Sequence, residues 1–454
     1  MGISNTDYVR LPQVYDPLVK LSHDGKSIKY FLAESMQADA QGTRWTIKIR
    51  PNAKTHDGNP FTAEDVLWNF KRIIDNNYQG AVPLGPINMG ASRAVDSTTV
   101  ELAFNSPFTI LEEVLAGLPF YYMAPQSWTA EKPVGTGPFV LESFKPGVSS
   151  SVKRFDGYWD SGKPYLDQIT VLNMADETTQ LNALQNGQVD AINYLSAQSV
   201  RQVQTGKYQV VISKTGGWAP ITMRCDTAPF DDPKVREALR LVIDRDQINQ
   251  NVYGGYGTLG NDVFGVADPL SAGAATRNRD VNKAKQLLAE AGHENLKLTL
   301  ITNDVVPAQR SVATLFAAQA KEAGIDISVE FQTATTFFAQ SYLKAPFAQD
   351  YWYYVPYLAN VVGATLSTAP FNATAFKDDE YDQLFQKAIS TLDTNERSGY
   401  VQAMQKIDYD RGGNIIPAFY PVIDAVTPKV GGVVEDISGF PLSNNTYQDI
   451  WLQP

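Results

Sequence analysis

The stretch Asp350–Tyr357 holds the most concentrated binding chemistry in the sequence, because five of its eight residues are aromatic. Tyrosine and tryptophan combine a flat apolar ring with a polar tip, which suits the wall of a cavity for a small molecule. If the stretch is a strand, alternation places Trp352 and Tyr354 on one face and the other rings on the opposite face. Pro356 should end the strand or place it at an edge. The same pattern also fits a half-buried strand that packs its rings into a core.

Catalytic and metal-binding chemistry has little support in the sequence. The three histidines, His23, His56 and His293, lie far apart, and no spacing of histidine and cysteine suggests zinc. The single cysteine, Cys225, has no histidine beside it and is expected to be a small buried hydrophobe. No Gly-x-Ser-x-Gly elbow or paired-acid motif occurs. We therefore predict no metal, no cofactor and no catalytic residue.

Length and composition indicate a globular protein with more than one core. A chain of 454 residues exceeds what one core usually supports, so two or three lobes are expected. The formal charge of −11 argues against a nucleic-acid-binding protein. No apolar run approaches the roughly 20 residues of a membrane span. Residues 1–4 carry no signal segment, which leaves open a cytosolic protein or one whose leader is absent from this sequence.

The first half of the chain mixes strands, turns and short helices. Alternation predicts strands at 45–50 and 98–104. Thr62 and Asp65 have the spacing of a capping box that begins a helix. The stretch Pro133–Phe139 contains several residues that break regular structure. It is expected to turn tightly, as a crossing between lobes rather than a phosphate loop.

The second half predicts a strand–helix–strand unit. A strand at 296–301, a helix at 307–323 and a strand at 325–331 should form a βαβ unit with parallel strands. Ligands of such sheets lie beyond the carboxyl ends of the strands, and the aromatic stretch follows about 20 residues later. The glycines at 254–257 suggest a linker or hinge. Further elements are expected as a helix at 281–291, helices near 378–391 and 395–411, and a strand at 415–420 returning to the first lobe.

Several motifs together carry a family resemblance. They are Tyr15–Val19, Trp45–Pro51, His56–Val66, Gly135–Phe139, Tyr158–Trp159, Leu184–Asp190, Phe230–Leu239 with Ile243–Arg245, and Lys283–Gly292. In this order they resemble the extracellular solute-binding proteins of ABC importers, family 5, the class that binds peptides, nickel and opines. The motifs cover nearly the whole chain.

The resemblance implies an α/β, two-lobed periplasmic-binding-protein-like fold, with mixed sheets flanked by helices and an additional domain inserted in the first lobe. Lobe I would comprise 1–24, 131–262 and 416–454, the extra domain 25–130, and lobe II 263–415. A small-molecule ligand would lie between the lobes, and the closed form would deliver it to an ABC permease in the membrane. The protein would act as a monomer, without nucleic acid, in the periplasm or at the outer face of the cytoplasmic membrane.

The ligand class stays open. At the position that corresponds to residues 351–360, the peptide-binding members of the family that this chain resembles carry a motif similar to Trp-x-x-Asp-Tyr. The aspartate of that motif holds the amino terminus of the peptide. Here the run contains no carboxylate, and Asp350 flanks it out of step with that motif. A buried ammonium without an anion costs several kcal/mol. Asp304 or Asp7 could replace the missing acid, and otherwise opine-like, glycosidic or aromatic compounds would stack on the rings.

The candidate binding residues are expected to line the cleft between the lobes. Arg224 would pair with a ligand carboxylate, or else form an ion pair within a lobe. Asn360 would bind the ligand or close a turn. The full set is Trp352, Tyr354 and Tyr357 from the second lobe, Tyr121, Tyr122 and Thr136 facing them, and Trp218, Arg224 and Asn360.

Two other functions use the same features. A hydrolase acting on a sugar or peptide would need two carboxylates about 5–10 Å apart across the cleft. A receptor that presents a bound ligand to a sensor protein would use the same cleft as a transport protein. Only partner binding would separate the receptor from the transport protein.

Overall fold

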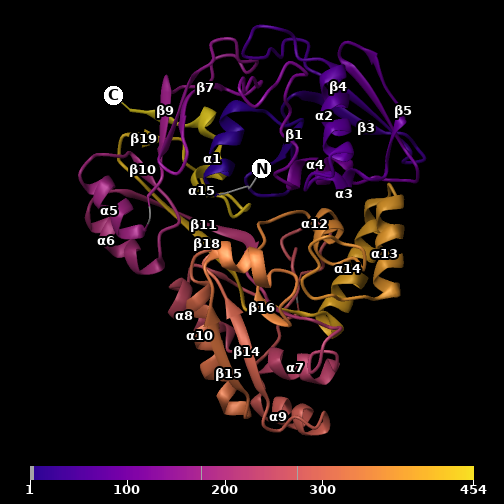
Figure 1. The fold of residues 1–454 in the computed structure, drawn as a ribbon, viewed down its shortest axis with the longest axis vertical. Coiled ribbons are helices and arrows are strands. Elements are labelled where there is room, and N and C mark those ends of the chain that lie inside the picture. The colour runs from indigo at the N-terminus through magenta and orange to yellow at the C-terminus, as the bar shows by residue number, and fades with distance from the viewer. Residues whose placement is uncertain (1–4, 175, 274, 454) are drawn as a thin grey trace.

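The computed structural model describes residues 5–174, 176–273 and 275–453, and it shows mixed sheets flanked by helices (Figure 1). The N-terminal third and both chain ends lie in the upper part of Figure 1, and the second lobe fills the lower part. The long strands β11 (Gln209–Trp218) and β18 (Ala418–Val426) lie between the two parts. This arrangement confirms the predicted α/β fold of two lobes.

The extra domain is built on a four-stranded antiparallel sheet. Its strands alternate buried and exposed residues, as β4 does along its whole length. Helix α2 covers the sheet, and its start is fixed by Asp65, whose carboxylate accepts from the backbone N–H of Thr62 at 2.8 Å. In sheet order the strands are β3 (Ala33–Ala38), β4 (Arg44–Ile49), β6 (Thr99–Phe104) and β5 (Ile87–Asp96), and the helices are α2 (Ala63–Asp75), α3 (Ala81–Leu84) and α4 (Leu111–Gly117).

The rest of the first lobe consists of small antiparallel sheets with helices at their edges. A hairpin, β1 (Val19–Leu21) with β2 (Ile28–Tyr30), packs against α4. The other strands are β7 (Phe139–Lys145), β8 (Ser149–Arg154), β9 (Gln168–Leu172), β10 (Ala191–Ile192), β11 (Gln209–Trp218), β13 (Thr258–Leu259), β18 (Ala418–Val426), β19 (Val430–Gly431) and β20 (Trp451–Leu452). The helices are α1 (Asn5–Val14), α5 (Glu177–Gln185), η1 (Ala197–Ser199), α6 (Val200–Thr205), α15 (Pro441–Asn445) and η4 (Tyr447–Asp449).

The second lobe contains the predicted βαβ unit. Strands β14 (Lys297–Thr302) and β15 (Asp326–Phe331) pair in parallel, and α10 (Gln309–Ala320) connects them. Their sheet has the order β15, β14, β16 (Phe347–Gln349), β12 (Ile221–Met223) and β17 (Asn414–Ile415). The helices are α7 (Pro233–Leu241), α8 (Arg245–Tyr253), α9 (Val281–Glu290), η2 (Lys321–Ala323), α11 (Ala334–Thr336), η3 (Phe337–Ser341), α12 (Tyr357–Ala364), α13 (Asp379–Ser390) and α14 (Thr394–Arg411).

The pairing of strand β12 favours a different division of the chain from the one expected. The sequence assigned 131–262 to the first lobe, but β12 pairs with β16 and β17 of the second lobe. Helix α7 packs against α9 in the same hydrophobic cluster. The predicted hinge glycines end α8, with Gly254 in the left-handed region at φ 62°, and lead into β13. We propose that 221–253 belongs to the second lobe, because a short strand takes its place from its hydrogen-bond partners.

The aromatic stretch is extended but is not a strand over its length. Strand β16 ends at Gln349, and Trp352 makes a single bridge with Trp218, with N···O distances of 2.8 and 2.9 Å. The backbone N–H of Tyr354 donates to the carbonyl of Ser438 in the first lobe at 2.7 Å. Pro356 precedes α12. The backbone groups therefore bond across the lobes instead of continuing the sheet.

The glycine-rich turn at 133–139 lies within the first lobe, not between the lobes as expected. The N–H of Gly137 donates to the carbonyl of Val14 at 3.0 Å, and the N–H of His56 donates to the carbonyl of Gly135 at 2.9 Å. A Cβ on Gly135 would lie 1.9 Å from the Val14 carbonyl oxygen, so only glycine fits this approach. The turn joins the extra domain to the end of α1.

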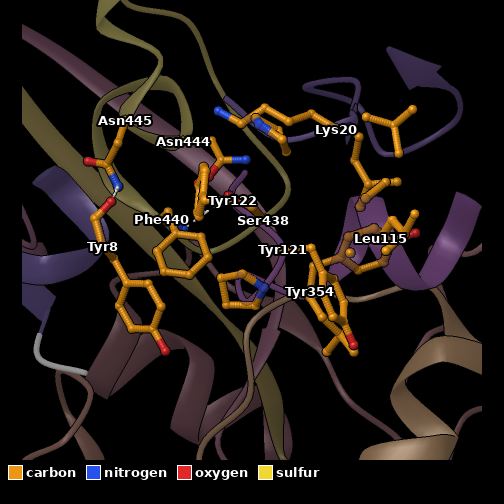
Figure 2. Close-up of a pocket in the computed structure, with 17 residues that line it drawn as sticks. Tyr8, Lys20, Leu115, Tyr121, Tyr122, Tyr354, Ser438, Phe440, Asn444 and Asn445 are labelled. Atoms are coloured by element: carbon orange, nitrogen blue, oxygen red, sulfur yellow. Dashed lines mark hydrogen bonds between the residues drawn. The ribbon is translucent and has the colours of Figure 1, made fainter. Parts of the chain in front are cut away.

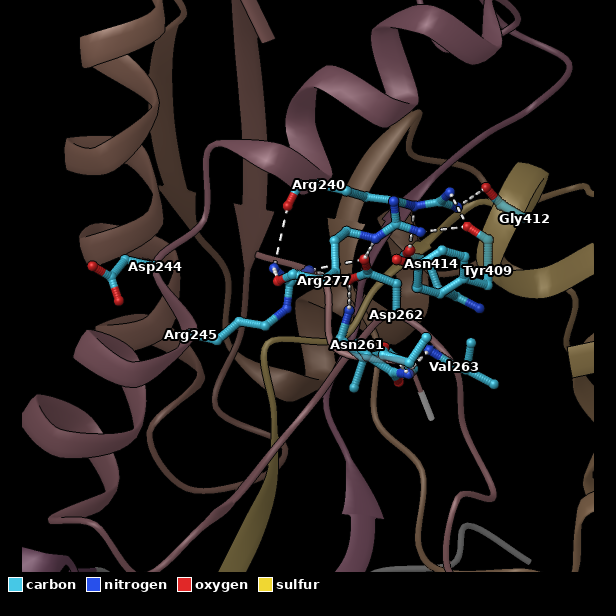
Figure 3. A network of polar contacts seen from close by, with 12 residues as sticks. Arg240, Asp244, Arg245, Asn261, Asp262, Val263, Arg277, Tyr409, Gly412 and Asn414 are labelled. Carbon is cyan, nitrogen blue, oxygen red and sulfur yellow. Dashed lines mark hydrogen bonds and ion pairs between the residues drawn. The ribbon is translucent and has the colours of Figure 1, made fainter. Parts of the chain in front are cut away.

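A buried ion network fixes the place where the chain returns from the second lobe to the first (Figure 3). Asp262 pairs with Arg245 at 2.7 Å and with Arg277 at 2.6 Å, and it accepts from the backbone N–H of Ile416 at 3.0 Å. Arg240 donates to the carbonyls of Tyr409, Gly412 and Asn414. The network connects the segment before β18 to helices α7, α8 and α14.

The two lobes are packed against each other in this structure. One hydrophobic cluster contains Leu111 and Val114 of the extra domain together with Val355 and Leu358 of the second lobe. Helix α12 contacts both α3 and α4. The structure is therefore a closed arrangement. Among the described residues, no helix combines the length and apolar character that a membrane crossing requires.

Candidate ligand-binding site

A cavity lies where α1, the β1 strand, the segment 115–122, Tyr354 and the segment 438–445 meet (Figure 2). Its volume is about 50 Å³, which holds only a few water molecules. We call it the junction cavity, because its walls come from the first lobe, the extra domain and the second lobe. Its wall is formed by Tyr8, Pro17, Val19, Lys20, Leu21, Leu115–Pro119, Tyr121, Tyr122, Tyr354, Ser438, Phe440, Asn444 and Asn445.

Aromatic rings form much of the wall. Phe440 stacks on Tyr353 with ring centroids 4.0 Å apart, and Tyr8 packs on Phe440 at 5.1 Å. Tyr354 is buried, and its hydroxyl has no hydrogen-bond partner among the described residues. Burial raises the pKa of Tyr354 well above its ordinary value, so its hydroxyl stays protonated and can donate.

Lys20 is the one charged residue among the described residues of the wall. It lies in β1, between Val19 and Leu21, and its side chain is half-buried. Burial lowers the pKa of Lys20, while the acids Asp16, Asp436 and Asp449 oppose this shift at a distance. The described wall of the junction cavity therefore holds one basic side chain and no carboxylate.

A left-handed turn holds the amide side chains at the cavity. The four residues Leu442–Asn445 have φ between 49° and 61°, and this conformation costs about 1–2 kcal/mol per residue for side chains other than glycine. Asparagine tolerates it better than most residues. Asp424 accepts from the N–H of Leu442 at 2.6 Å, and Gln13 donates to the carbonyl of Asn445 at 2.8 Å. Residues with a strained backbone of this kind are found most often at functional sites.

The structure brings three of the predicted binding residues to this cavity. Tyr121, Tyr122 and Tyr354 line it. Tyr121 is buried, and its hydroxyl donates to the carbonyl of Gly80 at 3.0 Å. Tyr122 is half-buried, and its backbone bridges to Pro17. These rings come from the extra domain and the second lobe, as expected for a site between lobes.

Three other predicted rings belong to a stacked column and are not among the residues that line the cavity. Trp352, Trp218, Phe264 and Tyr357 stack in this order, with centroids 5.9, 5.0 and 4.9 Å apart. Both faces of Trp218 are covered by neighbouring rings. Tyr357 is fully buried, and its hydroxyl donates to Asp408 at 2.7 Å. The aromatic stretch therefore splits between a core column and the cavity wall.

The remaining predicted residues, Arg224, Thr136 and Asn360, do not line the cavity. Arg224 pairs with Asp226 at 2.7 Å and donates to the carbonyl of Leu343 at 2.6 Å, which is the ion pair within a lobe that the sequence left open. Thr136 is buried, and its hydroxyl accepts from the N–H of Asp16 at 3.2 Å. Asn360 is buried in α12, and neither atom of its amide group has a hydrogen-bond partner within the described ranges.

The carboxylate of Asp350 is buried and accepts hydrogen bonds from the two residues that follow it. The donors are the N–H of Tyr351 at 2.8 Å and the indole N–H of Trp352 at 3.2 Å. Burial raises its pKa to about 7. Its carboxylate orients the start of the aromatic stretch, and it is not part of the described cavity wall.

Several wall residues were not predicted from the sequence. Lys20 and Asn444 are the clearest examples. Lys20 is a lone cation in the apolar run Leu18–Leu21, and a paired asparagine at 444–445 suits a left-handed turn. Both signals are visible in the sequence, but lone lysines in strands and asparagine pairs in turns also occur far from binding sites. Tyr8 and Phe440 had no signal beyond being aromatic.

The comparisons with known proteins agree with this architecture. The family model of the bacterial extracellular solute-binding proteins, family 5, matches residues 27–383. The glutathione-binding protein GsiB of Escherichia coli strain K12 is 28% identical, over 97% of this chain and 89% of that protein. GsiB of Shigella dysenteriae gives the same identity and coverage.

Solved structures match over almost the whole chain. The binding protein AgaA of A. tumefaciens R10, in complex with agropinic acid, superposes with a TM-score of 0.86 at 25% identity, covering 99% of this chain and 95% of that one. DppA of Helicobacter pylori, in complex with the peptide STSA, superposes with a TM-score of 0.87 at 21% identity, covering 99% and 94%. These structures share the fold of the two lobes. The protein therefore belongs to the bacterial extracellular solute-binding proteins of family 5, the solute-binding components of ABC importers.

Proposed function

We propose that this protein captures its solute in the junction cavity, between Tyr122 of the extra domain and Tyr354 of the second lobe, and releases it to the permease when the lobes open. The observation that carries this proposal is that three parts of the chain meet at one aromatic cavity. A cavity of about 50 Å³ is much smaller than the roughly 300–1,000 Å³ of a small-molecule site. The lobes must therefore separate to admit a solute, as in hinge closure around a ligand.

We expect the solute to belong to the same chemical classes as the ligands of the related proteins. GsiB binds glutathione, AgaA was solved with agropinic acid, and DppA with a peptide. For this chain we propose a peptide-like, opine-like, glycosidic or aromatic compound that stacks on Tyr122 and Tyr354. We further propose that the protein has no enzymatic activity of its own, acts as a monomer without nucleic acid, and works in the periplasm or at the outer face of the membrane.

Native mass spectrometry of the purified full chain tests this function. We expect a co-purified small molecule that leaves on denaturation, and titration calorimetry with glutathione, agropinic acid and the peptide STSA then compares the three classes. A protein that carries no small molecule and binds none of these probes would contradict the proposal. Release of a chemically altered solute would indicate a hydrolase instead.

Replacing Tyr354 by alanine is expected to weaken solute binding about tenfold or more. The substitution removes a buried ring from the wall, and one ring contact contributes about 0.5–1.5 kcal/mol beyond its buried area. Calorimetry with the bound solute measures the change. Tyr165→Ala is the matched control, because Tyr165 is 50% exposed at the surface. Equal affinities of the Tyr354→Ala variant and the natural protein would remove Tyr354 from the site.

Arg397 connects the lobes on the side of α13 and α14. Its guanidinium donates to the hydroxyl of Thr109 at 2.6 Å and pairs with Glu113 at 3.4 Å, and both partners belong to the extra domain. The N–H of Thr109 also donates to the carbonyl of Ile389 at 2.9 Å. These contacts exist only when the lobes are together, so they stabilise the closed form.

The Arg397→Ala variant is therefore expected to bind solute about 5- to 30-fold more weakly, which corresponds to about 1–2 kcal/mol of lost closure energy. Small-angle X-ray scattering should show a larger radius of gyration without solute. Lys406→Ala is the control, because Lys406 lies on the same helix in an exposed pair with Asp410. Unchanged affinity and size would mean that this contact does not control closure.

A further inference from the structure

We infer that the solute carries a carboxylate, or an equivalent anionic group, that binds to Lys20 in the junction cavity. The inference rests on the proposed function and names the chemistry of the solute at that site. It depends on three observations, which are the charge of the wall, the engagement of the nearby acids, and the hydrogen-bond donors of the same cavity wall.

The three acids that act on Lys20 at a distance are already engaged by other groups. Asp16 accepts from the indole N–H of Trp159 at 2.7 Å. Asp436 pairs with His23 at 2.7 Å and also accepts from the backbone N–H of Ser438 at 2.7 Å.

The third acid, Asp449, pairs with Lys163 at 2.7 Å. No carboxylate of the described residues lies within 4.0 Å of the Lys20 ammonium. Its nearest aromatic partner is the ring of Phe31, with Nζ 5.4 Å from the centroid. A half-buried cation without an anion beside a cavity is suited to an anionic ligand, because a buried charge is costly unless it is paired.

Two hydrogen-bond donors belong to the wall of the same cavity as this cation. Figure 2 shows Lys20, Asn444, Tyr122 and Tyr354 around the same space. The hydroxyl of Tyr354 has no partner, and no hydrogen bond is formed by the side-chain amide of Asn444 within the described part of the chain. A carboxylate accepts up to four hydrogen bonds, so the Lys20 ammonium and the amide N–H of Asn444 complement it well, and the hydroxyl of Tyr354 is a donor for another polar group of the solute.

The left-handed turn supplies independent support. Asn444 has φ 58° within the run of four residues, Leu442–Asn445, that share this unfavourable conformation. The contacts of Asp424 and Gln13 hold the turn in place. The fold thus maintains a strained segment at the position that directs Asn444 to the wall of the cavity beside Lys20.

The same charge inventory predicts which compounds the cavity disfavours. An α-ammonium placed here would meet Lys20 and no described carboxylate of the wall, so like charges would repel without compensation. A neutral amide would leave the Lys20 ammonium unpaired. A solute with an anionic end, and with any ammonium blocked or held outside this cavity, is therefore the preferred class.

The test compares matched compounds on the full-length protein by thermal shift and calorimetry. The panel contains acids of opine, N-acyl amino acid and aromatic type, each with its primary amide and with the corresponding amine. We expect acids to bind and stabilise the protein, and amides and amines to bind at least about tenfold more weakly. Native mass spectrometry of the co-purified solute should independently identify an acid.

Variants at Lys20 give the second part of the test. Lys20→Met keeps the length of the side chain and is expected to weaken acid binding by about 10- to 100-fold, while Lys20→Arg retains most of it. The melting temperature of the free Lys20→Met variant should stay the same or rise, because an unpaired half-buried ammonium is removed. Lys29→Met is the matched control, since Lys29 faces Lys20 across the β1–β2 hairpin and is exposed.

The outcomes separate this inference from the proposed function. If amides or amines bind as tightly as the acids, or if Lys20→Met binds the acid as the natural protein does, the inference is wrong and the solute-binding function still stands. If neither a co-purified solute nor any compound of the panel binds, the proposed site itself fails. Loss of acid binding in Lys20→Met, with retention in Lys29→Met, supports the inference.

Discussion

Replacing Asp262 by alanine is expected to lower the free energy of unfolding by about 3–5 kcal/mol. The carboxylate of Asp262 is fully buried between the guanidinium groups of Arg245 and Arg277, whose side chains are 5% and 7% exposed. Removing the anion leaves two buried cations without compensation. It also leaves the N–H of Ile416 without its acceptor, at the point where the chain returns to the first lobe.

Denaturant unfolding followed by circular dichroism measures this loss of stability. The Asp262→Asn variant separates the contribution of the charge from that of the hydrogen bond to Ile416. The asparagine still accepts from Ile416 but carries no charge, so it should be destabilising too, because the two guanidinium groups lose their anion. Asp410→Ala is the control, since its pair with Lys406 is exposed and worth at most about 1 kcal/mol. A loss below about 1 kcal/mol in Asp262→Ala would show that the network does not stabilise the fold.

A second large effect is expected on the dependence of stability on pH. Burial raises the pKa of Asp408 to about 7, although Tyr357 and Tyr381 donate to it at 2.7 and 3.3 Å. In the unfolded chain a carboxyl of this type titrates near pH 4. Between pH 4 and 7 the folded protein therefore holds a proton that the unfolded chain has lost.

The sign follows from this difference in bound protons. Stability decreases as pH rises through this interval, because the folded state binds more protons than the unfolded state. One such group contributes up to about 1.4 kcal/mol per pH unit. Burial raises the pKa of Asp16, Asp350 and Asp424 to about 7 as well, so these groups act in the same direction.

Urea unfolding at several values between pH 4.5 and 6.5 measures this slope in the natural protein and in Asp408→Asn. The amide keeps the shape of the side chain and an acceptor for Tyr357, so the variant should lose the contribution of one group and show a shallower slope. Asp410→Asn, at an exposed position, should keep the slope of the natural protein. A slope in Asp408→Asn as steep as in the natural protein would mean that Asp408 is already ionised in the folded state.

Local patterns predicted much of the fold. The parallel unit of β14, α10 and β15 follows from apolar periodicity and from the glycine that ends the helical segment, both of which depend on neighbours in sequence. The capping residue Asp65 marks the start of α2 in the same way. Short strands were less predictable. Strand β12 has three residues, so the lobe that we propose for it rests on its partners β16 and β17, more than 100 residues away in sequence.

The site was predicted only in outline. The sequence identified an aromatic stretch, and Tyr354 of that stretch does line the junction cavity. Its neighbours Trp352 and Tyr357 stack instead on rings of the column formed with Trp218 and Phe264. Whether an aromatic ring faces a ligand or packs in a core depends on the residues that the tertiary structure places opposite it. Alternation along the chain predicts the two faces only within a strand, and this segment leaves its sheet at Gln349.

The sequence by itself determined the family resemblance, the α/β composition and the absence of a carboxylate from the run 351–360, because these depend on residue types and their order. The tertiary structure alone decided which polar groups meet the rings. Lys20 and Asn444 are separated by more than 400 residues, yet they share one cavity wall with Tyr354. The packing of the hairpin, the left-handed turn and the second lobe brings a lysine, an amide and a phenol to the wall of one cavity and leaves the nearby acids engaged elsewhere.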